Sequence, residues 1–150
     1  YELADARLRA AGFDWYEVSN WSRPGGACRH NLGYWDGGQW WGAGPGAHGF
    51  VGAVRCWNVK HPNAYAQLID EGRLPIGGFE ELSESDRHTE EVMLGLRLRR
   101  GLTLSRLDTA ERQRAEVVVA DGLLVVEGDR LVLTDRGRLL ADGVVRTILG

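Results

Sequence analysis

Glycine and tryptophan are distributed unevenly along this 150-residue chain, and this limits how the chain can fold. All six tryptophans and 14 of the 21 glycines lie in residues 1–78. The segment Leu74–Gly78 contains a proline and two glycines, which interrupt regular secondary structure. We therefore expect two parts that are built differently, residues 1–78 and residues 79–150.

The overall composition is typical of a folded domain. Hydrophobic residues make up 43% of the chain and charged residues 26%. The net charge of −3 gives no electrostatic reason to bind nucleic acid or membranes, and no apolar run reaches the roughly 18 residues of a membrane-spanning helix. Two cysteines, Cys28 and Cys56, are too few for a disulfide scaffold, so we expect a cytoplasmic protein. The opening residues Tyr1-Glu2-Leu3 contain neither Met nor a signal peptide, which indicates a piece of a longer protein.

The first part predicts short elements separated by glycine-rich loops. Aromatic and β-branched residues favour strands, and Pro62 suits the first position of a helix. The expected elements are a helix over 3–10, a strand over 15–19, a short strand over 39–43, a hairpin of 50–52 with 54–59, and a helix over 62–72. Such a set barely closes a core of its own, and it is typical of the end of a larger sheet.

The second part predicts a more regular set of elements. Ser83 and Asp86 resemble a helix cap, and apolar residues follow at helical spacing until Gly101. Beyond a short turn to Leu107, we expect a helix over 112–120, a hairpin of 123–126 with 130–133, and a last helix that begins at Thr134 or Asp135 and carries Leu139, Leu140, Val144 and Ile148. Helix, short helix, helix, hairpin and helix is the order of a winged-helix-like domain, so the chain as a whole is expected to be α+β.

A winged helix suggests DNA binding, but the charges of the second part argue against it. Residues 79–150 hold 11 basic and 14 acidic residues, and the charges within 111–116, in the candidate recognition helix, cancel. DNA binding depends on neutralising phosphates with Lys and Arg. We therefore expect a protein-interaction or lid role for this part, and no nucleic-acid partner.

Four side chains of residues 29–35 form the strongest candidate site. His30, Asn31, Tyr34 and Trp35 place an imidazole, an amide, a phenol and an indole within one or two turns of backbone. Asn31 is suited to orient the imidazole, and the two aromatic rings can flank a flat ligand. A lone histidine is more often a surface or hydrogen-bonded residue, and that alternative stays open here.

The glycine-rich segment Gly42–Gly49 is a weaker candidate. It matches neither a phosphate-binding loop with its lysine nor a dinucleotide fingerprint. It is interpreted either as a tight turn or as a loop whose backbone approaches a ligand. A structural zinc site is not expected, because Cys28 and His30 have no second pair of ligands nearby. Glu17 follows a strand, and it is either a ligand contact or a solvated residue.

Three ordered blocks resemble one known family. They are Tyr16–Gly25, Cys28–Trp35 and Gly42–Gly49, and shorter matches follow at 95–101, 121–124 and 133–137. The sequence is similar to the oxygen-independent coproporphyrinogen III oxidase-like proteins of the radical S-adenosylmethionine superfamily, and in particular to their heme-chaperone branch. The resemblance implies the end of a radical S-adenosylmethionine (β/α) barrel in 1–78 and the family's winged-helix-like C-terminal domain in 79–150.

The resemblance also implies a ligand and roles for the motif residues. The pattern of His30, Asn31, Tyr34 and Trp35 is similar to the heme-binding signature of the chaperone branch, which delivers heme to client proteins. His30 would be the axial ligand of the iron, Asn31 would orient it, and Tyr34 and Trp35 would pack on the porphyrin. The alternatives are a portion of a true coproporphyrinogen III oxidase and a winged-helix interaction module.

The family's radical chemistry requires residues that this chain lacks. The [4Fe–4S] cluster is held by three cysteines in a Cys-x3-Cys-x2-Cys motif, whereas this chain has two cysteines 28 positions apart. We expect cluster and S-adenosylmethionine in the full-length protein and no catalysis by this chain alone. The family's glycine-rich loop implies that Ala47 and His48 line the S-adenosylmethionine pocket. An uncovered barrel edge further predicts homo-oligomers formed through residues 13–60.

Overall fold

The computed structural model describes residues 1–150, which divide into two compact units. One unit combines Tyr1–Asp36 with Thr89–Gly150, and the other is Gly37–His88. The chain alternates helices and strands, and every strand pair is antiparallel, so the expected α+β class is confirmed. None of the helices is both long and apolar enough to span a membrane.

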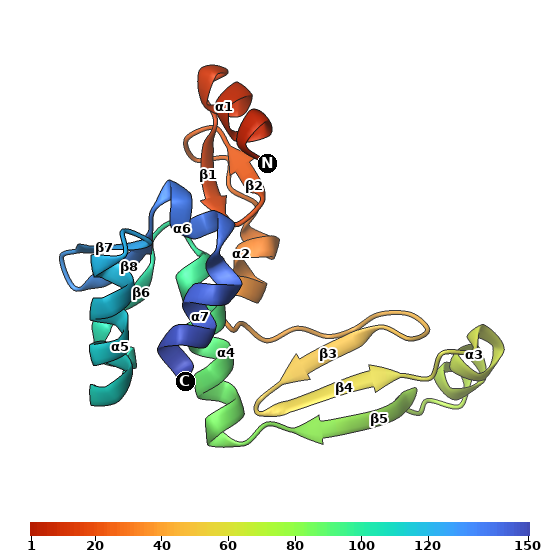
Figure 1. Ribbon diagram of the computed structural model, residues 1–150. Helices are drawn as coiled ribbons and strands as arrows, with labels where there is room; N and C mark the ends of the chain where they lie inside the picture. Colours follow the sequence, from red (N-terminus) through yellow and green to blue (C-terminus); the bar gives the residue numbers. More distant parts are fainter. The chain divides into compact units, whose positions relative to one another are not determined.

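The larger unit ends in a domain with the expected winged-helix order (Figure 1). The elements of this domain are α4 (Glu84–Arg97, which begins in the other unit), β6 (Leu102–Thr103), the 3₁₀ turn η1 (Leu104–Arg106), α5 (Thr109–Ala120), β7 (Leu124–Glu127), β8 (Arg130–Leu133), α6 (Asp135–Leu139) and α7 (Ala141–Leu149). The three strands pair in the order β6-β8-β7, and α5 packs against α7 and β7.

This domain is built around one apolar core. The core side chains come from every major element of the domain. The most deeply buried of them are no more than 2% exposed and include Val92, Leu96, Val118, Leu124, Leu131 and Ile148. Helical and strand periodicity place them on inward faces, as the sequence pattern predicts. The elements of this part are therefore positioned by burial of apolar surface, which is the dominant driving force of folding.

The ends of two helices differ from the expectation. Helix α5 begins at Thr109 and not at Arg112, because the Asp108 and Glu111 side chains form a reciprocal capping box with the backbone. The last helix is broken at Leu140 into α6 and α7, and Thr134 caps α6. The break changes the helical phase, so Leu139 and Leu140 are 46% and 48% exposed, whereas Val144 and Ile148 are buried as predicted.

The N-terminal part of the same unit consists of α1 (Glu2–Ala10), β1 (Asp14–Glu17), β2 (Asn20–Ser22) and α2 (Arg29–Trp35). Strands β1 and β2 form a hairpin in which Trp15 lies opposite Trp21, and β2 was not predicted. Trp15 is 7% exposed, and the centre of its ring lies 4.6 Å from the guanidinium carbon of Arg138. The edge of β1 is partly covered as well, since the Arg99 N–H donates to the Tyr16 carbonyl at 3.0 Å.

The second unit is a three-stranded antiparallel sheet with one helix. Its elements are β3 (His48–Val51), β4 (Val54–Asn58), α3 (Pro62–Asp70) and β5 (Ile76–Glu81), in the sheet order β3-β4-β5. The hairpin and the helix starting at Pro62 are confirmed. The segment over 39–43 is not a strand and makes only an isolated bridge between Trp40 and Phe50. The expected boundary at residue 78 falls inside β5, where Gly78 makes room for the Trp57 ring.

Candidate functional site

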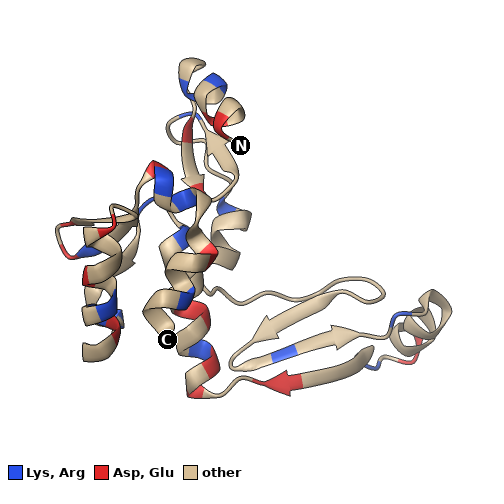
Figure 2. Cartoon of the chain, in the orientation of Figure 1, with Lys and Arg blue, Asp and Glu red and all other residues tan.

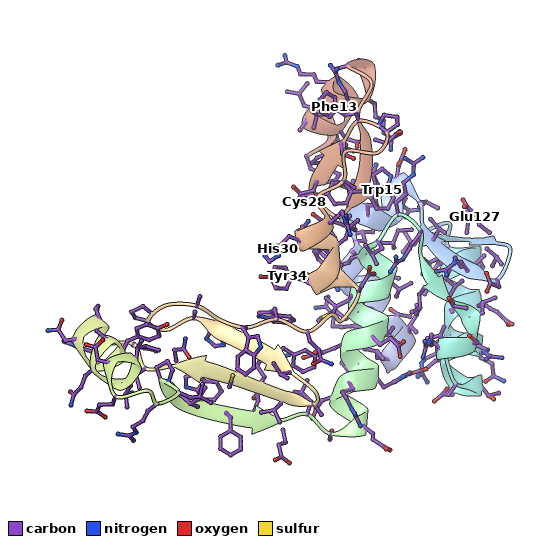
Figure 3. All side chains as sticks on the ribbon, turned by 180° about the vertical axis from the view of Figure 1, so that it is seen from behind. Phe13, Trp15, Cys28, His30, Tyr34 and Glu127 are labelled. Carbon is purple, nitrogen blue, oxygen red and sulfur yellow. The ribbon has the colours of Figure 1, made fainter.

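Helix α2 carries all four residues of the His-Asn-x-x-Tyr-Trp motif. It is seven residues long and contains no buried residue. Residues four apart on a helix share one face, and His30 and Tyr34 project together from α2 (Figure 3). Their rings meet edge to face with centroids 4.9 Å apart, and the Tyr34 hydroxyl lies 3.0 Å from His30 Nε2. Both side chains are exposed, Tyr34 to 38%.

The exposed imidazole is the group of this helix that can ligate iron. A neutral imidazole binds a metal through a nitrogen lone pair, which is how proximal histidines hold heme iron. In the structure, Nε2 is engaged by the Tyr34 hydroxyl, and the tautomer decides which of the two atoms donates. Coordination through Nε2 therefore requires this hydrogen bond to break.

Asn31 has a different partner from the one expected. Its Nδ2 donates to Glu17 Oε1 at 3.1 Å and lies 3.4 Å from the Tyr16 hydroxyl oxygen. Asn31 is half-buried and turns toward β1, about 100° around the helix from His30. The amide therefore attaches α2 to β1, and the expected role of Asn31 in orienting the imidazole stays a prediction. Trp35, four residues after Asn31, is likewise half-buried.

Polar contacts hold α2 at both ends. Near its first turn, Asn31 bonds to Glu17, which is only 1% exposed. Just after its last turn, the Asp36 carboxylate pairs with the Arg100 guanidinium. Glu17 was expected to be either a ligand contact or a solvated residue, and its burial excludes a solvated residue. No local pattern marks the contact with Asn31, since the two residues are 14 positions apart.

The glycine-rich loop uses its backbone groups within the chain. The Asn58 side-chain amide donates to the carbonyls of Gly42 and Gly44 at 2.9 Å each, and the Gly44 N–H donates to the Tyr65 hydroxyl at 3.1 Å. A Cβ on Gly42 would lie 2.4 Å from the His48 carbonyl oxygen, so this position needs glycine. The interpretation as a tight turn is therefore sufficient for this segment. Asn58, which is 5% exposed, was not predicted to organise the loop.

Ala47 and His48 lie at the end of this loop. The Ala47 carbonyl accepts from the Asn58 N–H at 2.9 Å, and His48 begins β3 with its ring centroid 5.9 Å from that of Trp57. Both residues belong to the unit Gly37–His88, whereas the motif of α2 belongs to the other unit. The predicted role of Ala47 and His48 beside S-adenosylmethionine stays a prediction.

The residues of this chain do not fit an iron–sulfur cluster. No three His, Cys, Asp or Glu side chains gather in a way that could hold a metal ion. Cys28 and Cys56 are free thiols and belong to different units. A cubane cluster needs several thiolates converging on one point. The residues of this chain are therefore given no role as cluster ligands. His30 remains the candidate ligand of a heme iron.

Comparison with known sequences identifies relatives over the whole chain. Residues 82–140 match the family described as the HemN C-terminal domain. The chain is 71% identical over its 150 residues to the heme chaperone HemW of Mycobacterium tuberculosis, of which it covers 38%. It is 32% identical over 158 aligned residues to the heme chaperone HemW of Bacillus subtilis, of which it covers 42%. The chain thus spans about two fifths of the length of these relatives.

Comparison with solved structures identifies a similar fold. The coproporphyrinogen III oxidase HemN from Escherichia coli, a radical SAM enzyme, matches with a TM-score of 0.71 over 98% of this chain and 39% of that one. The sequence identity is 18%, so this likeness concerns the fold alone.

Proposed function

We propose that this chain, which belongs to the HemN-related radical S-adenosylmethionine family and to its HemW branch, carries the heme-binding part of a protein that passes heme to client proteins. The family membership rests on the identity to HemW proteins along the whole chain. The observation that supports the function is the geometry of α2, where an exposed imidazole and an exposed phenol ring stand side by side.

His30 supplies the iron-binding nitrogen in this proposal. Its imidazole would exchange the hydrogen bond with the Tyr34 hydroxyl for a bond to the heme iron, and the Tyr34 ring would pack against the porphyrin edge. Asn31 holds the helix from its other side, where Trp35 is half-buried. Trp35 contributes to the porphyrin contact only through the part of its ring that stays accessible.

The exposure of the site suits transfer better than permanent storage. Small-molecule sites usually enclose most of their ligand. A seven-residue helix without a buried residue offers an open face, from which a ligand can be handed to a partner protein. We therefore expect weaker and more reversible heme binding than in a protein that encloses its heme.

The test is a hemin titration of the protein followed by its Soret band. We expect a saturable red shift that is lost in His30→Ala and kept in His61→Ala, because His61 is an exposed histidine outside the motif. Tyr34→Phe keeps the ring and removes the hydroxyl from Nε2, so hemin should bind at least as tightly as in the parent. An identical titration of parent and His30→Ala would contradict the proposal.

The other expectations concern the whole protein. S-adenosylmethionine and the [4Fe–4S] cluster would be bound by the rest of the sequence, with Ala47 and His48 near S-adenosylmethionine. It stays a prediction that the protein delivers heme to client proteins, is cytoplasmic and has no nucleic-acid partner. Association of copies of this chain through residues 13–60 stays a prediction as well. Figure 2 shows acidic and basic residues interspersed on α5, a charge distribution that offers DNA no basic face.

A further inference from the structure

Glu17 is a buried carboxylate in an unusual environment. It lies at the end of β1 and is 1% exposed. Its Oε1 accepts from the side-chain amides of Asn20 and Asn31, both of which are neutral donors, and its Oε2 has no hydrogen-bond partner. Burial of a carboxylate without a cation and with one oxygen unsatisfied opposes folding. The presence of Glu17 at this buried position is therefore not explained by a contribution to stability.

The backbone of Glu17 is fixed to the C-terminal part of the same unit. Glu17 forms an antiparallel bridge with Leu98, and the Arg99 N–H donates to the Tyr16 carbonyl at 3.0 Å. Leu98 is 2% exposed and follows directly on α4. The backbone that carries the Glu17 carboxylate is therefore held by hydrogen bonds to the C-terminal part. Helix α2, in contrast, has no buried side chain that would hold it in place.

The motif residues of α2 form two stripes. His30 and Tyr34 lie one turn apart on the exposed stripe, and Asn31 and Trp35 lie one turn apart on the half-buried stripe. A rotation of the helix by about 100°, the step of one residue, would move His30 and Tyr34 into the position of the half-buried stripe. The bond from Asn31 to Glu17 is directional, so it opposes this rotation in a way that a non-directional apolar contact would not.

We propose that Glu17 is a positioning residue for heme binding: by holding Asn31 it sets the rotation of α2 and keeps His30 and Tyr34 on the exposed face. This inference rests on the proposed function for the identity of the ligand. The orientation of α2 can be measured without any ligand.

The proposal predicts that stability and binding respond in opposite directions. Glu17→Leu removes a buried carboxylate that has no cation and one unsatisfied oxygen, which favours folding, and the amides of the exposed Asn20 and the half-buried Asn31 can donate to water instead. The melting temperature should therefore stay the same or rise. At the same time, the amides of Leu32 and Asp36, which close the turns of α2, should exchange faster with solvent, and the Kd for hemin should rise about tenfold, the effect of one lost directional hydrogen bond.

Four further variants separate positioning from a general effect on the fold. Glu17→Gln keeps an acceptor oxygen for Asn31, so it should restore hemin binding and amide protection. Asn31→Leu should match Glu17→Leu, and the double variant should lose no more than either one, because both remove the same contact. Asn20→Ala removes the other donor to the carboxylate from β2, and it should leave hemin affinity within twofold of the parent.

The amide-exchange and hemin results can be read separately. Unchanged exchange of Leu32 and Asp36 in Glu17→Leu would overturn the positioning role, whatever the hemin result. An equal loss of hemin binding in Asn20→Ala and Glu17→Leu would also overturn it. If the parent protein does not bind hemin, the proposed function fails, and faster exchange in Glu17→Leu but not in Asn20→Ala still supports the positioning of α2.

Discussion

Two parts of the larger unit, residues 89–150 and residues 1–36, are stabilised in different ways. The C-terminal part surrounds an apolar core to which α4, α5, α7 and the β7–β8 hairpin all contribute. The N-terminal part adds Trp15 as its only buried apolar side chain of comparable size. Its other buried side chains, Asp5 and Glu17, are carboxylates.

Polar contacts attach the N-terminal part to the C-terminal part. Arg138 of α6 donates to Asp5 of α1 through both terminal nitrogens, at 3.0 and 3.3 Å, and lies over the rings of Trp15 and Tyr1. Arg9 pairs with Asp135, and Asp36 pairs with Arg100. Apolar burial is strong but non-directional, whereas these contacts have defined geometry. We therefore interpret the apolar core as the main source of stability. The polar contacts of the N-terminal part orient helix α2.

Removing apolar volume from the C-terminal core should have the largest effect on stability. Leu96 of α4 is fully buried. Leu96→Ala should lower the free energy of unfolding by about 3 kcal/mol, within the usual range of about 2–5 kcal/mol for such a truncation. Leu139→Ala, at a 46% exposed position, should cost less than about 1 kcal/mol. Urea denaturation measures both, and equal costs would show that the core does not dominate stability.

Breaking the principal polar attachment should have a smaller effect. Arg138→Met leaves Asp5 paired only with the half-exposed Arg9, and it removes the cation over Trp15. We expect a loss of about 2 kcal/mol. The double variant Asp5→Leu/Arg138→Met should be more stable than Arg138→Met, because it also removes the buried carboxylate that has lost its two hydrogen bonds from Arg138. Urea denaturation of the four proteins in this cycle tests the comparison, and a loss in Arg138→Met greater than that in Leu96→Ala would reverse it.

The same contrast explains what could be predicted from the sequence. In residues 79–150, apolar periodicity and turn residues are local signals, so α4, α5, the β7–β8 hairpin and the winged-helix order were predicted correctly. The errors there are the unpredicted short strand β6, the capping box of Asp108 that starts α5 three residues early, and the break of the last helix at Leu140. In the N-terminal part, helix α2 has no buried residue and therefore no periodic signal that predicts it.

The candidate site shows a similar limit. The four motif residues were found from their side-chain types and through a resemblance, but the contact of Asn31 with Glu17 was not predicted, because the two residues are 14 positions apart on different elements. Asp5 and Arg138 are 133 positions apart, and the Asn58 amide reaches Gly42 from 16 positions away. Polar pairing over such distances leaves no periodic trace in a single sequence, whereas the positions of apolar residues do.

Lowering the pH should weaken the ion pairs that attach the N-terminal part to the C-terminal part. The resulting loss of stability should be smaller than the losses expected for Leu96→Ala and Arg138→Met. The hydrogen bond from Arg138 is the main reason that the pKa of Asp5 lies below its ordinary value, and the hydrogen bond from Arg9 is the main reason that the pKa of Asp135 does so. In the unfolded chain, both carboxyl groups titrate near their ordinary pKa of about 3.9. Above that pH, both states are ionised and the stabilisation is fully present. As the pH falls toward the lowered folded pKa values, the unfolded state binds more protons, so the stabilisation is progressively lost.

Denaturation midpoints measured from pH 7 down to pH 2 test this expectation. Asp5→Asn should reduce the acid-induced loss of stability between about pH 4 and the lowered folded pKa of Asp5, because the linked proton uptake on unfolding disappears. Asp70→Asn, at an exposed position of α3, provides the control and should leave the profile unchanged. Identical profiles for the parent and Asp5→Asn would mean that the Asp5–Arg138 contact adds nothing that depends on ionisation. The N-terminal part would then be held by the packing of Trp15 beneath Arg138, and the distinction between an apolar core and a polar attachment would no longer apply.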